Sequence, residues 1–249
     1  MSDSLPIPPR GIFAFPGLSP HPAPAESEAI VALADRRIRH VLFDWDGTVV
    51  DSHGHIVSAF VEAVQEVIGV IPDLRLVEAL VGRPVEAMFL AVVGKAQLLP
   101  RLLEAFERQY VKGCAIRPEP VLPGVLALLC WLLSTEGIRA SVTSNKRAAT
   151  LLASVASSGL ASLFDSLQDA QNYPGKPDPA MGRAIQCRGG WAAGELLMIG
   201  DSDVDEKFAR ALGCPFLRLI HSGVTGPAEA MLANDVQGRV QTYRTNAGM

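Results

Sequence analysis

Residues 41–52 of this chain read Val-Leu-Phe-Asp-Trp-Asp-Gly-Thr-Val-Val-Asp-Ser, and the rest of the sequence is organised around them. The apolar run that opens the stretch predicts a short buried strand. Asp44 and Asp46 follow it two residues apart, a spacing that places both carboxylates on one side of an extended chain. Gly47 permits a turn that other residues resist, and Thr48 adds a hydroxyl. Two carboxylates at the end of a buried strand are costly unless a cation or a reaction requires them.

After residue 123 the sequence alternates between helical and strand patterns. Strands are expected at 138–143, 164–167, 196–199 and 216–220, and helices at 124–135, 146–157, 178–187 and 204–212. Such alternation predicts the α/β class, with a doubly wound, Rossmann-like parallel sheet. In these folds ligands bind at the carboxyl ends of the strands.

Between the first strand and this region, apolar residues recur at helical spacing and predict an all-helical insert. The expected division is a proline-rich N-terminal tail with a lead-in helix, 1–37, a core of 38–53 and 121–249, and a helical cap domain, 54–120. The role of the tail is not predicted, and a weak helical pattern at 228–232 carries no recognisable chemistry.

A second strand end carries hydroxyls. Residues 137–146 read Gly-Ile-Arg-Ala-Ser-Val-Thr-Ser-Asn-Lys, so the strand ends at Thr143 and Ser144 and a helix then begins. The free N–H groups at a helix start suit a phosphate. Taken alone, such a turn is more often a helix cap.

Two further segments complete the polar set. Lys176 lies in a turn stiffened by prolines (Pro-Gly-Lys-Pro-Asp-Pro, 174–179), which suits a charge that must be aimed, although a loop lysine is usually solvated. Another apolar strand runs into Asp201, Asp203 and Asp205, acids that repel one another unless a cation lies among them.

In these four segments the chain resembles the haloacid dehalogenase-like (HAD) superfamily, in the family's order. Its motifs are Asp-x-Asp-Gly-Thr, a Thr or Ser at a strand end, Gly-Lys-Pro-x-Pro and Gly-Asp-Ser-x-x-Asp. The matching positions here are Asp44 and Asp46, Ser144 with Thr143 as the near alternative, Lys176, and Asp201 and Asp205. Asp203 falls at a variable position and is expected to be solvated. The Gly-Ile-Arg and Ser-Asn-Lys segments resemble phosphoglycolate-phosphatase-like members in particular.

The resemblance implies a phosphatase that forms an aspartyl-phosphate on Asp44, while Asp46 protonates the leaving oxygen and later activates water. It implies Mg²⁺ held by Asp44, the backbone carbonyl of Asp46 and Asp201. It also implies phosphate binding by Ser144 or Thr143, Asn145 and Lys176, with Asp205 and Thr48 in support. A small phosphorylated metabolite would be the substrate, with phosphoglycolate as the family-level expectation.

Asp46 distinguishes among the reactions that members of the resembled superfamily catalyse. Family dehalogenases lack an Asp there, and phosphonate-cleaving members share the Asp-Trp pair but carry Ala, so phosphate ester hydrolysis is favoured over C–Cl or C–P cleavage. A phosphotransferase or phosphomutase of the β-phosphoglucomutase type stays open because it uses the same core. A non-catalytic binding module is disfavoured because every chemical position is filled.

Within the expected cap, Gly82 and Arg83 match the loop that reads substrates in such members, although a solvated arginine fits equally well. His53 and His55 lie at the expected hinge; either could face the site, but exposed linker histidines are commoner.

Composition limits the kinds of partner that we expect this chain to bind. The formal net charge of −4 gives no basic footprint for nucleic acid, and no apolar run is long enough for a membrane span. The four scattered cysteines are expected to be buried thiols in a reducing compartment. With no evident secretory signal, we expect a cytoplasmic enzyme, monomeric or homodimeric.

Overall fold

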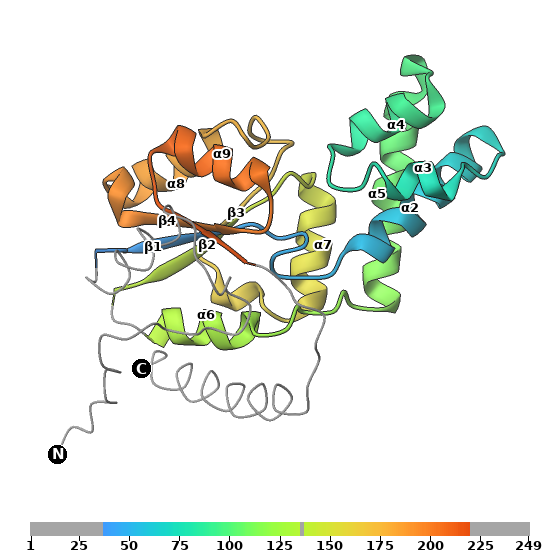
Figure 1. Cartoon of the computed structure of the whole chain (residues 1–249). Helices are drawn as coiled ribbons and strands as arrows, with labels where there is room; N and C mark the ends of the chain where they lie inside the picture. The colour runs from blue at the N-terminus through green and yellow to red at the C-terminus, as the bar shows by residue number, and fades with distance from the viewer. Residues whose placement is uncertain (1–36, 135–136, 220–249) are drawn as a thin grey trace.

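The computed structural model describes residues 37–134 and 137–219. At its centre is a five-stranded parallel sheet of order β3-β2-β1-β4-β5 (Figure 1). The strands are β1 (His40–Phe43), β2 (Arg139–Thr143), β3 (Leu167–Gln168), β4 (Leu196–Gly200) and β5 (Phe216–Arg218). Since β1 pairs with β2 on one side and β4 on the other, the carboxyl ends of these three strands meet at one edge, where the strand order reverses.

Helices cover both faces of the sheet because alternate side chains of each strand point to opposite faces. Val41 and Phe43 pack on the side of α6 (Val125–Ser134) and α7 (Ala148–Ser158). Leu42 faces α8 (Ala180–Gly189) and α9 (Asp203–Leu212) instead. Short 3₁₀ turns, η2 (Ala161–Leu163) and η3 (Ala193–Glu195), complete this part. The predicted α/β doubly wound fold is confirmed.

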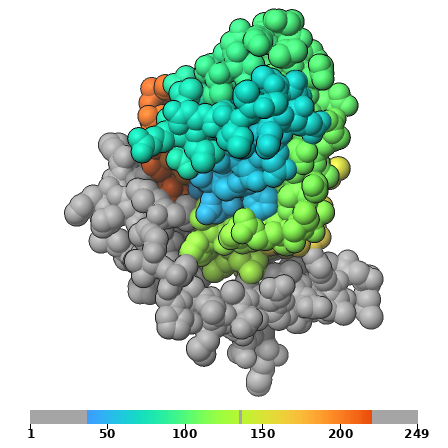
Figure 2. Space-filling model, turned by 90° about the vertical axis from the view of Figure 1, so that its right-hand side faces the viewer, coloured from blue at the N-terminus to red at the C-terminus, as the bar shows by residue number. Residues whose placement is uncertain are grey.

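The helical insert lies beside the sheet and has a core of its own (Figures 1 and 2). It contains α2 (His53–Ile68), α3 (Leu74–Glu78), α4 (Val85–Val93), η1 (Ala96–Leu98) and α5 (Leu99–Ile116). Phe60 of α2 stacks on Phe89 of α4 with ring centroids 4.3 Å apart. Gly69 and Gly94 end α2 and α4 in the left-handed conformation that glycine adopts without penalty.

The two connections between sheet and insert pair with each other. Val50 forms an antiparallel bridge with Val121, and the Asp51 backbone N–H donates to the Pro120 carbonyl at 2.9 Å. The first connection leads from β1 to α2, and the second leads from α5 back to the sheet. Hydrogen bonding between them fixes where the insert joins the core.

Several expectations need correction. The third strand was expected at 164–167 but lies at Leu167–Gln168, because Phe164 ends the preceding turn and packs its ring against Phe43 and Trp45. The cysteines are free, but only Cys114 and Cys214 are buried, while Cys187 is exposed. The N-terminal tail and the weak helix at 228–232 lie outside the described residues. No helix within the described ranges is long and apolar enough to cross a membrane.

His40, at the start of β1, is a buried titratable group away from the strand ends. Its Nε2 lies 2.9 Å from Ser141 Oγ, and its Nδ1 has no hydrogen-bond partner among the described residues. A charged imidazole would therefore leave an N–H without an acceptor. Burial lowers the pKa of His40 to about 4, so the native state holds it neutral.

We predict that this histidine makes the protein acid-sensitive. Below pH 6.5 the unfolded chain takes up a proton that the folded chain refuses until about pH 4. The contribution of His40 to stability therefore falls across that window, by up to about 3 kcal/mol. Asp44, whose pKa is about 8, contributes with the opposite sign between pH 8 and pH 4, so the difference between wild type and His40→Gln isolates the histidine. Urea unfolding across this range should show that wild type loses more stability toward acid than His40→Gln, which cannot titrate. Equal pH dependence in the two proteins would contradict the assignment.

Candidate active site

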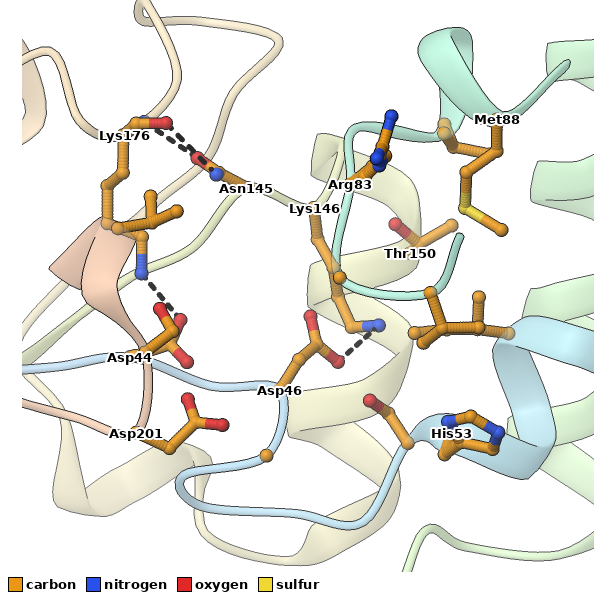
Figure 3. A pocket seen from close by; sticks show the side chains of 18 of the residues that line it. Asp44, Asp46, His53, Arg83, Met88, Asn145, Lys146, Thr150, Lys176 and Asp201 are labelled. Carbon is orange, nitrogen blue, oxygen red and sulfur yellow. Dashed lines mark hydrogen bonds and ion pairs between the residues drawn. The ribbon is translucent and has the colours of Figure 1, made fainter. Parts of the chain in front are cut away.

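A buried lysine pairs with two carboxylates at the carboxyl edge of the sheet, and Figure 3 shows this lysine, Lys176, pointing toward one of them, Asp44. Lys176 Nζ is 2.6 Å from Asp44 Oδ1 and 2.6 Å from Asp205 Oδ1. Burial alone would lower the pKa of Lys176, but Asp44 and Asp205 raise it above its ordinary value, so the ammonium stays charged. Burial raises the pKa of Asp44 to about 8; Lys176 opposes this, and the neighbouring acids Asp205, Asp201 and Asp46 add to it. One lysine does not balance these carboxylates.

Asp201 approaches Asp44 from the end of β4. The Thr48 hydroxyl lies 3.1 Å from Asp44 Oδ2 and 3.1 Å from Asp201 Oδ1, so one hydroxyl joins the two acids. Gly47 has a φ of +76°, and a Cβ at this position would lie 2.6 Å from Asp201 Oδ2. Only glycine therefore allows the first strand's loop to pass so close to the second acid.

The carboxylates fit a hard cation. Oxygen atoms of Asp44, Asp201 and Asp205 all lie within 4.8 Å of one another. Asp205 is the least available, because its Oδ1 pairs with Lys176 and its Oδ2 accepts from the backbone N–H and the hydroxyl of Ser202. Asp44 and Asp201, whose pKa values are both raised by burial, are the two that gain most from a cation between them.

Asn145, expected to bind phosphate, has its side chain engaged with the lysine loop. Its Oδ1 accepts from the Lys176 backbone N–H at 2.7 Å, and its Nδ2 donates to the Lys176 carbonyl at 3.2 Å. The end of β2 is therefore tied to the turn that aims the lysine. The Asn145 side chain also lines the cavity at this edge.

The two candidate hydroxyls differ in direction. Thr143 Oγ1 lies 3.7 Å from Met198 Sδ, within the sheet's core. Ser144 Oγ accepts from the Lys146 backbone N–H at 3.1 Å, as in a turn before a helix. Both side chains are fully buried, and neither lines the cavity.

Lys146 is a site residue that the sequence reasoning missed. Its Nζ lies 2.7 Å from Asp46 Oδ1, and its side chain is almost fully buried. The sequence signal was its position two residues beyond Ser144, at the same sheet edge as Asp46. The ion pair places a cation on the side of Asp46 away from Lys176 (Figure 3).

A cavity of about 350 Å³ lies over these residues, between the sheet edge and the insert. Gly82 and Arg83 line it from the insert, beside an apolar wall whose members are Ile56, Val81, Val85, Met88 and Phe106. Asp44, Asp46, Lys176 and Asp201 line the opposite side. His53 also lines it, whereas His55 is buried and its Nε2 lies 2.8 Å from the Arg117 carbonyl.

A family model, described as haloacid dehalogenase-like hydrolase, matches residues 41–219 of this chain. The chain belongs to the haloacid dehalogenase-like hydrolase family. Among curated relatives, a protein named probable phosphatase IndB from Dickeya dadantii is 34% identical, over 70% of this chain and 77% of its own length. A plasmid-encoded phosphoglycolate phosphatase from Cupriavidus necator is 32% identical over 76% of this chain and 84% of its own.

Solved structures of other members share the fold. A haloacid dehalogenase-like family hydrolase from Streptococcus pneumoniae superposes with a TM-score of 0.63 at 22% identity, covering 81% of this chain and 92% of its own. CbbY from Rhodobacter sphaeroides, solved with phosphate, gives 0.63 at 20% identity, covering 76% and 90%. The sheet edge described above is thus the edge of a dehalogenase-like core.

Asp203 and Asp205 give this hydrolase a matched pair of acids on one helix. Asp203 is 79% exposed and pairs with Arg218, in agreement with the solvated position expected for it. Asp205 is buried, and every group that its two oxygens contact is a donor. An amide at 205 would have to turn its NH₂ toward a donor, whereas an amide at 203 would stay in water.

We therefore predict that Asp205→Asn destabilises the protein by about 2–4 kcal/mol, since a buried charge pair is broken. Asp203→Asn should change stability by less than about 0.5 kcal/mol, because an exposed ion pair contributes little. Urea unfolding of the two variants beside wild type measures the difference. Similar losses in both would mean that the buried contacts of Asp205 contribute nothing special.

Proposed function

We propose that this hydrolase is a Mg²⁺-dependent phosphatase that cleaves a small phosphate monoester through an aspartyl-phosphate. The observation that carries the proposal is Asp44, a buried carboxylate held by Lys176 and Thr48 at the mouth of a cavity, with Asp46 two residues away. The phosphatases among its relatives, at 34% and 32% identity, support the same reaction class. A cytoplasmic location remains the expectation from the sequence.

In the proposed reaction, Asp44 attacks phosphorus and the ester oxygen leaves with a proton from Asp46, which splits one hard displacement into two steps. Asp46 then takes a proton from the water that hydrolyses the acyl phosphate. Lys176 stays within reach of the phosphoryl oxygens because Asp205 and Asn145 hold its side chain and its backbone. The N–H groups at the end of β2 are the proposed contacts for the remaining charge. Ser144 is fully buried beside the cavity, so its proposed phosphate contact requires its hydroxyl to turn toward the substrate.

Asp44, Asp201 and the backbone carbonyl of Asp46 are the proposed ligands of Mg²⁺, which when bound would offset the negative charge of substrate and nucleophile. Thr48 holds the two carboxylates at one hydroxyl. Asp205 supports the site through Lys176 and does not take part as a ligand.

Asp46 and Trp45 together argue against phosphonate hydrolysis. Trp45 is fully buried, and its Nε1 donates to Ser154 Oγ at 2.6 Å. The Asp-Trp likeness to phosphonate-cleaving members is therefore a packing feature, whereas Asp46 lines the cavity. The residue that faces the substrate is the one that favours an ester.

The insert is proposed to act as a mobile cap that reads the alcohol part of the ester. Arg83 supplies a cation for a carboxylate or another polar group, and the apolar wall beside it suits a carbon skeleton. Phosphoglycolate is the first substrate to test. Esters with a longer carbon chain and a terminal acid belong in the same panel, because apolar residues of the insert line the same cavity as Arg83.

The first test is phosphate release from such a panel, with and without Mg²⁺. We expect metal-dependent release by wild type and a loss of roughly 10³-fold or more in Asp44→Asn, since the nucleophile is gone. Asp203→Asn serves as the matched control and should retain activity. Phosphate appearing on an added alcohol acceptor in place of water would indicate a phosphotransferase. No turnover in either assay by folded protein would favour a binding module.

Mg²⁺ binding has a readout that does not depend on turnover. Bound Mg²⁺ should raise the melting temperature by several degrees at saturating concentration, because a ligand that binds only the folded state stabilises it. The increase should be larger at pH 8 than at pH 6, since the cation must displace the proton that burial favours on Asp44, whose pKa is about 8. Asp201→Asn should abolish most of the increase. An unchanged increase in that variant would exclude Asp201 as a ligand.

A further inference from the structure

A chain of buried hydrogen bonds runs from Asp46 to the connection between insert and core. Lys146, paired with Asp46, also donates from Nζ to the Tyr110 hydroxyl at 2.5 Å. Tyr110, on α5 of the insert, donates to Glu119 Oε1. Ser154 of α7 donates to Glu119 Oε2 and accepts from Trp45 Nε1–H at 2.6 Å. Glu119 itself is 2% exposed.

The Glu119 carboxylate determines which groups donate and which accept in these hydrogen bonds. An ionised Glu119 can only accept, so Tyr110 and Ser154 must each give it their single hydroxyl proton. Tyr110 then has only lone pairs to offer, and these face the ammonium of Lys146. Burial, with Asp46 and Glu119 nearby, raises the pKa of Tyr110, so this residue stays a neutral phenol.

Glu119 lies in the connection that joins the insert to the core. It precedes Pro120, whose carbonyl accepts from Asp51 in the pairing of the two connections. The Lys146 ammonium lies 4.2 Å from the centre of the Tyr110 ring as well as against its hydroxyl. Asp46 of the core and Tyr110 of the insert thus both contact Lys146, and Glu119 of the connection reaches this lysine through Tyr110.

We propose that Glu119 is a positioning residue for Asp46, holding Lys146 through Tyr110 so that the acid's side chain is correctly placed only when α5 is seated on the core. The proposal rests on the proposed function, in which Asp46 protonates the leaving oxygen. It assigns a task to a residue of the connection that touches neither substrate nor metal. It also links the seating of the insert to the geometry of the acid.

The test uses the leaving group. An alkyl phosphate needs a proton on its leaving oxygen, whereas p-nitrophenyl phosphate releases a stable phenolate and does not. The ratio kcat/KM reports the steps up to formation of the aspartyl-phosphate, so it isolates acid catalysis from the later attack of water. Glu119→Gln keeps the side chain's size, but its NH₂ must face one of the two hydroxyls and reverses that hydrogen bond.

We expect Glu119→Gln to lower kcat/KM about tenfold for the alkyl ester and less than about threefold for the aryl ester. Tyr110→Phe breaks the same chain without placing an amide in the core and should show the same selectivity. Combining Glu119→Gln with Asp46→Asn should add no selectivity beyond that of Asp46→Asn, because the two residues act in series.

Glu107→Gln is the matched control. Glu107 is a carboxylate of α5, the helix that carries Tyr110, and it contacts the core through Arg147 without joining the chain to Asp46. It should change both esters by the same factor. Equal losses with the two esters in folded Glu119→Gln and Tyr110→Phe, or none, would overturn the proposal. If Asp46→Asn itself showed no selectivity, the acid role would fall, and the positioning role would fall with it.

Discussion

The burial of one lysine among carboxylates is the constraint on which the site depends. Lys176 can remain charged in the interior only because Asp44 and Asp205 lie 2.6 Å away. Asp44 directly follows β1, Asp205 lies in the first turn of α9 after β4, and the lysine comes from a third loop. The contact can therefore exist only if β1, β4 and the lysine turn meet at one edge, so the fold and the site specify each other.

A surplus of negative charge follows from that arrangement. The single ammonium of Lys176 faces Asp44 and Asp205, and the Thr48 hydroxyl brings Asp201 close to Asp44. Burial raises the pKa values of Asp44 and Asp201. The proposed cation and the lysine have complementary tasks. The cation would offset the charge of Asp44 and Asp201, and Lys176 already offsets that of Asp44 and Asp205.

Much of this could be predicted from the sequence, for reasons that are particular to each residue. Asp44, Asp46 and Asp201 directly follow buried apolar strands, and a parallel sheet brings such strand ends together. Asn145, Lys146 and Glu119 could not be assigned in the same way, because their contacts depend on side-chain direction. Asn145 turns to the lysine turn, Lys146 to Asp46, and Glu119 into the core from a connection that reads as exposed.

The third strand shows the same limit on the fold. Residues 164–167 begin and end with an apolar side chain, yet Phe164 precedes the strand and packs its ring on Phe43 and Trp45. Burial of the side chain does not require the residue to belong to the sheet. The sequence pattern predicted a strand here and could not fix where it begins.

The alternation after β1 limits which changes of sequence this stretch can tolerate. Asp44 and Asp46 face the cavity, while Trp45 between them is fully buried and anchored to Ser154. Gaining or losing one residue here would turn the indole toward solvent and drive both carboxylates into the apolar core. The stretch can therefore accept other apolar residues at its apolar positions, but it cannot change in length without displacing both carboxylates from the cavity.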